Sequence, residues 1–151
     1  MNHVITVGTF DILHYGHLNL LRECRRIAGP KGWVSVGVNS DEVAESRGKR
    51  IVQTGLHREL VVGALRHVDH TFLYYNGPDK IVRRFNSKID GPAAVAGYRF
   101  LVVGDDWAPT DRYLKLLGVA RDWLFEHQIS LIFVPHTMGV SSTELRARAR
   151  E

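Results

Sequence analysis

Five short apolar runs recur along this chain, and polar stretches with the composition of helices separate them. The runs are rich in valine, isoleucine and aromatic residues and are bounded by turn residues, which is typical of buried strands. They cover residues 3–8, 32–38, 68–75, 98–104 and 129–135. The other stretches predict helices over about 15–28, 55–66, 79–86, 111–127 and 142–150, and residues 87–97 predict a surface loop.

Strands that alternate with helices are joined by right-handed crossovers, which make neighbouring strands parallel. Continuously apolar strands are typical of a sheet that is covered on both faces. The sequence therefore predicts an α/β fold, a Rossmann-like, doubly wound, five-stranded parallel sheet with helices on both faces. Such sheets bind ligands at the carboxyl ends of their strands. We expect function in the segments that follow Gly8, Val38, Gly104 and Pro135.

Composition favours one ordinary domain over residues 1–151, with 44% hydrophobic and 24% charged residues. No apolar run approaches the roughly 20 residues of a membrane span, and residues 1–15 lack the order of a signal peptide. The single cysteine, Cys24, excludes an internal disulfide, favours a reducing cytoplasmic setting and is expected in the core. The net charge of +4 favours anionic partners such as nucleotides, phosphorylated metabolites or nucleic acid.

The first strand leads into the sequence GTFDILHYGH, residues 8–17. A helix that begins here offers free backbone N–H groups and the positive end of its dipole, which attract phosphate. His14 and His17 lie three residues apart, on one side of the first turn, where both can donate hydrogen bonds. Gly8 and Gly16 let the backbone approach a ligand closely. The pattern predicts phosphate chemistry at this junction.

The residues of this segment also permit roles that involve no phosphate. One histidine could cap the turn or pack in the core, the pair could bind a transition metal together with Asp11, or the glycines could mark an ordinary turn. Asp11 could also simply fix the turn. Two histidines, two glycines and an aspartate directly after a buried strand favour the phosphate site over these alternatives.

Later segments at the same edge of the sheet also carry groups that bind anions. Arg47, Lys49 and Arg50 lie in a loop after the second strand, which could close over phosphates or serve solubility. The paired aspartates after Gly104 could bind metal. Ser141 and Glu144 have the spacing of a capping box, and this serine- and threonine-rich helix start predicts a second anion site.

These motifs together resemble those of the nucleotidylyltransferase superfamily, whose hallmark is His-x-Gly-His, here His14-Tyr15-Gly16-His17. The segments GKR to HRE, VGDDW and GVSST follow in the superfamily's order, and the resemblance covers most of the chain. Within the superfamily the chain is most similar to the glycerol-3-phosphate cytidylyltransferases. The resemblance implies attack of a phosphate monoester on the α-phosphorus of CTP, which yields a CDP-linked product and pyrophosphate. It also implies a homodimer that binds no nucleic acid and does not enter a membrane, with Mg²⁺ held mainly by the nucleotide phosphates and possible help from Asp11.

The same resemblance assigns roles to particular residues. Catalysis is expected from His14, His17, Lys49 and Arg58, and acceptor binding from Arg47, Arg58 and Lys80. The implied nucleotide contacts are Gly8, Thr9, Phe10, Asp11, His14, Gly16, His17, Lys49, Asp106, Trp107, His136, Thr137, Gly139, Val140, Ser141, Ser142 and Thr143. The acceptor that the resemblance implies is a small phosphorylated alcohol, with glycerol 3-phosphate as the first choice.

Two departures from the family pattern affect the acceptor more than the chemistry. His136 stands where the family has an arginine, so a titratable donor replaces a permanently charged one, and Arg112 or Arg146 could take over its phosphate contact. The segment over residues 108–128 is longer than its family counterpart and predicts an added helix. Two other functions stay open. One is adenylyl transfer to a sugar phosphate or another acceptor, and the other is non-catalytic binding of nucleotides or nucleic acid, although the sequence has no obvious basic and aromatic stacking surface.

Overall fold

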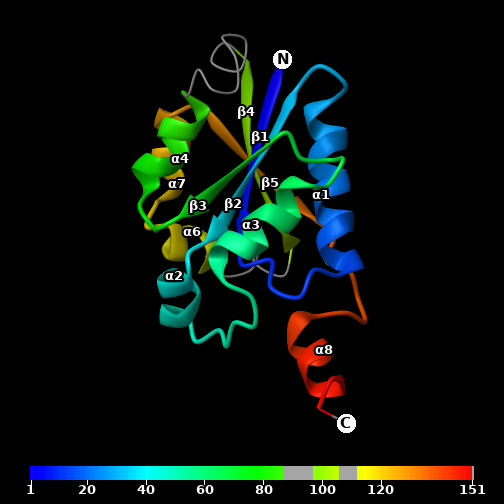
Figure 1. The fold of residues 1–151 in the computed structure, drawn as a ribbon. Helices are drawn as coiled ribbons and strands as arrows, with labels where there is room; N and C mark the ends of the chain where they lie inside the picture. The colour runs from blue at the N-terminus through cyan, green and yellow to red at the C-terminus, as the bar shows by residue number, and fades with distance from the viewer. Residues whose placement is uncertain (87–96, 106–111, 151) are drawn as a thin grey trace.

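The computed structural model of the chain describes residues 1–86, 97–105 and 112–150. Within them, the strands are β1 (Asn2–Gly8), β2 (Trp33–Asn39), β3 (His70–Tyr74), β4 (Tyr98–Gly104) and β5 (Ile129–Val134). They form a five-stranded sheet in the order β3-β2-β1-β4-β5, and all four neighbouring pairs are parallel (Figure 1). The predicted doubly wound parallel sheet is confirmed.

Most of the predicted helices are present, with two differences. The described helices are α1 (Tyr15–Ala28), α2 (Asp41–Ser46), α3 (Gly55–Gly63), α4 (Pro78–Phe85), α6 (Arg112–Leu117), α7 (Arg121–Glu126) and α8 (Ser142–Arg148). Helix α2 was not predicted; it is one short helix capped by Ser40, whose Oγ accepts a hydrogen bond from Val43 N. The single helix predicted over 111–127 is wrong, because Gly118 adopts a positive φ of 71° and separates α6 from α7. The predicted loop over 87–97 lies almost entirely outside the described residues.

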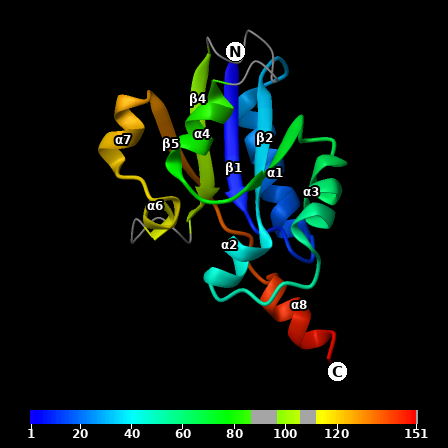
Figure 2. The same ribbon diagram turned by 60° about the vertical axis from the view of Figure 1, so that its left-hand side comes forward.

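Helices cover both faces of the sheet, as Figure 2 shows. Helices α1 and α3 pack on one face, where Leu21, Cys24 and Val62 are buried, and burial raises the pKa of the Cys24 thiol to about 12. Helices α4, α6 and α7 pack on the other face and bury Phe85 and Leu117. Helix α8 lies beyond the carboxyl edge of the sheet in both views. Cys24 is therefore a core residue, as predicted.

Strands β1 and β4 separate at their carboxyl ends. Their pairing stops at Ile5 and Leu101, whereas β4 continues beside β5 as far as Gly104 and Val134. The chain reverses its strand order between β1 and β4, since β2 and β3 lie on one side and β5 on the other. Ligand sites of doubly wound sheets lie at such a switch point.

A tyrosine replaces the missing strand partner at the end of β1. The Tyr113 hydroxyl, from α6, accepts a hydrogen bond from Val7 N at 3.2 Å and donates one to Val7 O at 3.1 Å. Buried backbone groups need such partners. The tyrosine thus satisfies Val7 while β1 and β4 stay apart.

The described helices include none that is long and apolar enough to cross a membrane.

Candidate active site

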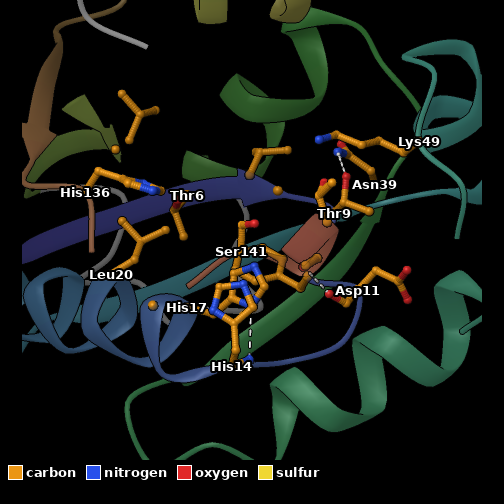
Figure 3. Close-up of a pocket in the computed structure, with 18 of the residues that line it drawn as sticks. Thr6, Thr9, Asp11, His14, His17, Leu20, Asn39, Lys49, His136 and Ser141 are labelled. Atoms are coloured by element: carbon orange, nitrogen blue, oxygen red, sulfur yellow. Dashed lines mark hydrogen bonds between the residues drawn. The ribbon is translucent and has the colours of Figure 1, made fainter. Parts of the chain in front are cut away.

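A cavity of about 740 Å³ opens at the carboxyl edge of the sheet, where β1 and β4 diverge. Its walls come from the ends of β1, β2, β4 and β5, the start of α1, the loop after α2 and the start of α8. Figure 3 shows it with His14 and His17 on one side and His136 and Lys49 on others. The sequence-predicted residues that line it are Gly8, Thr9, Phe10, Asp11, His14, Gly16, His17, Arg47, Lys49, His136, Thr137, Val140, Ser141, Ser142 and Thr143.

The two histidines of the first junction stack on each other, with ring centroids 3.9 Å apart and planes inclined by 25°. His14 N donates a hydrogen bond to His17 Nδ1 at 3.3 Å. In its neutral form His17 therefore carries its proton on Nε2, which remains a donor. Burial, with a smaller contribution from His14, lowers the pKa of His17 to about 3. His17 is thus a neutral donor at physiological pH.

The same junction comes very close to the loop that precedes α8. A Cβ on Gly16 would lie 3.0 Å from the His14 ring and 3.2 Å from Val140 Cγ1. These separations are too short for a side chain at this position unless the neighbours move. Glycine at position 16 therefore allows the first helix start and the last one to meet.

Asp11 holds this junction together. One of its oxygens accepts hydrogen bonds from Val52 N at 2.9 Å and Arg146 Nη2 at 2.6 Å, and the other accepts from Gln53 N at 3.0 Å. Burial would raise the pKa of the carboxyl, but these bonds outweigh it and hold the pKa below its usual value. Because both oxygens are engaged within the protein, the structure favours the turn-fixing role over metal binding.

The second junction brings hydroxyl groups to the cavity from α8 and the segment before it. Ser142 Oγ donates to Asp11 O at 2.6 Å, Ser141 Oγ accepts from Glu144 N at 3.1 Å, and Thr137 Oγ1 accepts from Asn19 Nδ2 at 3.0 Å. The predicted cap at Ser141 is confirmed. The two junctions, more than 120 residues apart in sequence, share a single cavity.

The basic loop, residues 47–50, follows α2 and forms another wall. Arg47 Nη2 donates to Asn76 Oδ1 at 2.9 Å, and Arg47 Nη1 donates to Asn39 Oδ1 at 3.4 Å. Lys49 is exposed and reaches towards the cavity in Figure 3. The loop therefore adds positive charge to a cavity that already contains Arg146.

The family model described as "Cytidylyltransferase-like" matches residues 5–148. The chain belongs to the cytidylyltransferase-like family. Glycerol-3-phosphate cytidylyltransferase of Bacillus subtilis (strain 168) is 28% identical over 146 residues, which cover 97% of this chain and 95% of that protein. An FAD synthase of Methanopyrus kandleri is 39% identical over 70 residues, which cover 46% of this chain and 47% of that protein.

The comparison with solved structures concerns the fold. The crystal structure of the lipopolysaccharide core biosynthesis protein from Thermoplasma volcanium GSS1 superposes with a TM-score of 0.62 at 22% identity, over 91% of this chain and 98% of that one. This neighbour shows the fold alone, whereas the family match and the relatives show that the cytidylyltransferase-like chain is a nucleotidyltransferase.

Three described residues that the resemblance placed at the site of this cytidylyltransferase-like chain do not line the cavity. Arg58 is completely buried and does not line the cavity. Its guanidinium donates to the carbonyl oxygens of Gln53, Thr9 and Asn39 at 2.8, 2.6 and 2.8 Å and to Asp41 Oδ1 at 2.7 Å. The prediction that Arg58 contacts the acceptor directly is not supported by its position, because all three of its side-chain nitrogens are engaged by protein groups.

Lys80 also lies away from the cavity. It belongs to α4, where its ammonium stands 5.2 Å from the centre of the Tyr75 ring. It borders a separate shallow hollow with Phe72, Arg83 and Arg84. The prediction that Lys80 contacts the acceptor in this cavity is not supported by its position. Gly139 likewise does not line the cavity, and it has a positive φ of 77° in the turn before α8.

Asp106 and Trp107, which the resemblance placed beside the nucleotide, lie outside the described residues, and so does the side chain of Arg112. Sequence reasoning missed several residues that line the cavity, among them Thr6, Leu20, Asn39, Ser46 and Tyr113. Position at a strand end could have indicated Asn39, which closes β2. No local pattern marks Tyr113, because its role depends on the separation of β1 and β4.

The residues of this family member favour anions over protein-held metal. Among the described residues, no group of three or more histidine, cysteine, aspartate or glutamate side chains could hold a metal ion. Mg²⁺ prefers carboxylate and other oxygen ligands. The described lining offers Asp11 as its carboxylate, and that carboxylate is occupied. These residues do not fit a Mg²⁺ site made by the protein alone.

Proposed function

We propose that this chain transfers a cytidylyl group from CTP to the phosphate of a small phosphorylated alcohol, with glycerol 3-phosphate as the first candidate. The observation that carries the proposal is the convergence of His14 and His17 with the hydroxyls before α8 and the cations Arg47 and Lys49 around one cavity. The similarity to glycerol-3-phosphate cytidylyltransferase along most of both chains supports the choice of substrates.

In the proposed reaction, an oxygen of the acceptor phosphate attacks the α-phosphorus of CTP. The bond from that phosphorus to the bridging β-oxygen breaks, and pyrophosphate leaves with the electron pair. The attacking phosphate is already anionic, so the site needs no strong general base. Its task is to bring two polyanions together in line and to stabilise charge on the α-phosphoryl group.

The described residues divide this task by position. The His17 Nε2–H is a neutral donor held in one tautomer by His14 N, which suits charge that develops on the transferring group. Arg47 and Lys49 both line the cavity, which supports the proposal that they bind phosphates of the acceptor and the nucleotide. Arg146, kept beside the cavity by Asp11, is placed to replace the charge that His136 does not permanently carry.

We propose that Mg²⁺ reaches the site on the phosphates of CTP rather than on protein ligands, because the Asp11 oxygens are engaged. When bound there it would neutralise phosphate charge. The expected homodimer, the single domain over residues 1–151 and the cytoplasmic location stay predictions. Light scattering on the purified chain tests the first of these.

The charge of the described lining also limits the acceptor. Among the described residues of the lining, Asp11 alone carries a carboxylate, and it is paired with Arg146. An acceptor with an ammonium group would find no unpaired carboxylate in this part of the wall. We therefore propose an acceptor that is uncharged apart from its phosphate.

The test is a pyrophosphate-release screen that crosses the four common ribonucleoside triphosphates with phosphorylated alcohols and sugars, phosphocholine included. We expect release with CTP and glycerol 3-phosphate and a product with the mass of CDP-glycerol. Turnover of ATP without turnover of CTP would reject the choice of nucleotide. Preference for phosphocholine would reject the choice of acceptor.

A second candidate is adenylyl transfer to a phosphorylated acceptor by the same chemistry. The similarity to an FAD synthase over about half of the chain favours keeping it. The ATP arm of the screen, with product mass as the readout, distinguishes the two candidates.

A further inference from the structure

Thr9 follows directly after β1 and faces the cavity between the two junctions. Its backbone is fixed, because its carbonyl oxygen accepts a hydrogen bond from the buried Arg58 at 2.6 Å. Its side chain is fixed separately, by Asn39 at the end of β2. Asn39 Nδ2 lies 3.1 Å from Thr9 Oγ1, as the dashed line in Figure 3 marks.

The orientation of the Asn39 amide follows from its other neighbour. Arg47 Nη1 lies 3.4 Å from Asn39 Oδ1. A guanidinium can only donate hydrogen bonds, so the amide atom that faces Arg47 must be the oxygen. The NH₂ group must then face Thr9. Asn39 is only 2% exposed, so water has little access to compete for these contacts.

This arrangement limits the directions in which the Thr9 hydroxyl can donate its proton. Because Oγ1 accepts from Asn39, the hydroxyl donates in another direction, and no described residue accepts from it. Thr9 itself lines the cavity, so a group bound there can accept from this hydroxyl. Thr9 therefore offers a hydrogen-bond donor to whatever anion occupies the space next to His14 and His17.

Asn39 also helps to hold Arg47 at the cavity. Arg47 donates to Asn39 on one side and to Asn76 on the other, at 2.9 Å. Asn76 does not line the cavity and makes no described contact with Thr9. The two asparagines thus share one partner, and only Asn39 also contacts Thr9.

We propose that Asn39 is a positioning residue that links the acceptor side of the site to the nucleotide side. Its oxygen holds Arg47, and its NH₂ group turns the Thr9 hydroxyl proton towards the transferring phosphoryl group. This inference rests on the proposed function, since it assigns the two sides of the cavity to the two substrates.

The test compares two isosteric substitutions, Asn39→Asp and Asn76→Asp. Both keep an oxygen for Arg47, but only Asn39→Asp replaces the donor to Thr9 with an acceptor, which would draw the Thr9 proton away from the cavity. We expect Asn39→Asp to lower kcat at least about tenfold. This is a part of the roughly 10²- to 10³-fold rate increase that one oriented donor contributes. Asn76→Asp should change kcat less than about twofold, because aspartate tolerates the positive φ at this exposed position.

A double-mutant cycle separates positioning from a merely structural role. Thr9→Val should lower kcat as Asn39→Asp does, and the double variant should be no slower than Thr9→Val alone. Additive losses, or equal kcat in Asn39→Asp and Asn76→Asp, would overturn the proposal. Thermal melts of all variants check folding. If kcat falls in proportion to the loss of melting temperature, whether or not Thr9 is present, the proposal is also overturned.

Failure of the proposed function gives a different result. If the wild-type chain turns over none of the substrate pairs, the proposed reaction is rejected. The affinity for CTP and ATP, measured by calorimetry, then tests whether Asn39 acts through Thr9. Thr9→Val and Asn39→Asp should weaken binding by the same factor and Asn76→Asp should not, and equal affinities in all three variants would reject the link as well.

Discussion

The β1–α1 junction and the basic loop face the same cavity but are held in very different ways. In the junction, the Thr9 carbonyl, the Asp11 carboxylate and His17 Nδ1 all have protein partners. Its backbone also has positive φ angles at Phe10 and Ile12, 53° and 51°. Such conformations are costly for residues other than glycine, and they persist where the surroundings fix them.

The basic loop is fixed mainly through its backbone and Arg47. Gly48 N and Lys49 N donate to the carbonyl oxygens of Glu45 and Ala44, and the side chains of Lys49 and Arg50 are exposed. Donors that stabilise a transition state must be oriented in advance, whereas charges that attract a polyanion act over longer distances. We therefore expect the junction to contribute to the rate and the loop to affinity.

The largest effect is expected at the buried charge that supports the junction. Replacing Arg58 with methionine leaves Asp41 and three carbonyl oxygens without their donor, so we expect a loss of about 3–5 kcal/mol in the free energy of unfolding. Urea denaturation measures it. Arg50→Met, in the exposed loop, is the matched control and should cost less than about 0.5 kcal/mol. Equal losses of unfolding free energy in both variants would contradict the conclusion that the junction is held more firmly than the loop.

The next effect concerns the oriented donor itself. His17→Ala removes the Nε2–H, and we expect kcat to fall at least about 10²-fold while the dissociation constant of CTP changes much less. Steady-state kinetics and calorimetry measure the two quantities. His57→Ala, on the exposed surface of α3, is the control. Wild-type kcat in His17→Ala would end the assignment of catalysis to the junction.

The pH dependence of stability should also depend on the buried imidazoles. Burial lowers the pKa of His17 to about 3 and that of His3 to about 4, below the unfolded value of 6.5. Between those values the unfolded chain binds more protons than the folded one, so stability falls as the pH falls below 6.5. We expect each histidine to contribute about 1–2 kcal/mol of loss between pH 7 and pH 5. Urea midpoints of the wild type and His17→Asn measure it, and an unchanged slope in the variant would contradict the assignment.

The smallest effect is expected from the loop. Lys49→Met should raise KM for CTP about tenfold and change kcat less than about threefold, and the effect should shrink at high salt because Lys49 is exposed. Kinetics at two salt concentrations measure both. A hundredfold fall in kcat would place Lys49 with the junction and would restore the direct catalytic role predicted from the sequence.

The fold could be predicted from the sequence because strand and helix periodicity are local properties. The Ser141 cap and the position of His17 and Ser142 in one cavity also followed, since both segments come after strands that end at one edge of the sheet. The role of Arg58 did not, because whether a charged side chain is buried depends on its partners, here Thr9, Asn39, Asp41 and Gln53. The same holds for Tyr113, whose hydroxyl hydrogen-bonds to the backbone of Val7, 106 positions away.

The ion pair between Asp11 and Arg146 joins residues 135 positions apart. A nascent chain that leaves the ribosome therefore exposes His14 and His17 long before Asp11 can meet its partner. The sheet also forms late, because β1 at its centre needs β4 as a neighbour. Such distant pairing slows folding. The cavity can thus be completed only late in synthesis, when α8 emerges and docks.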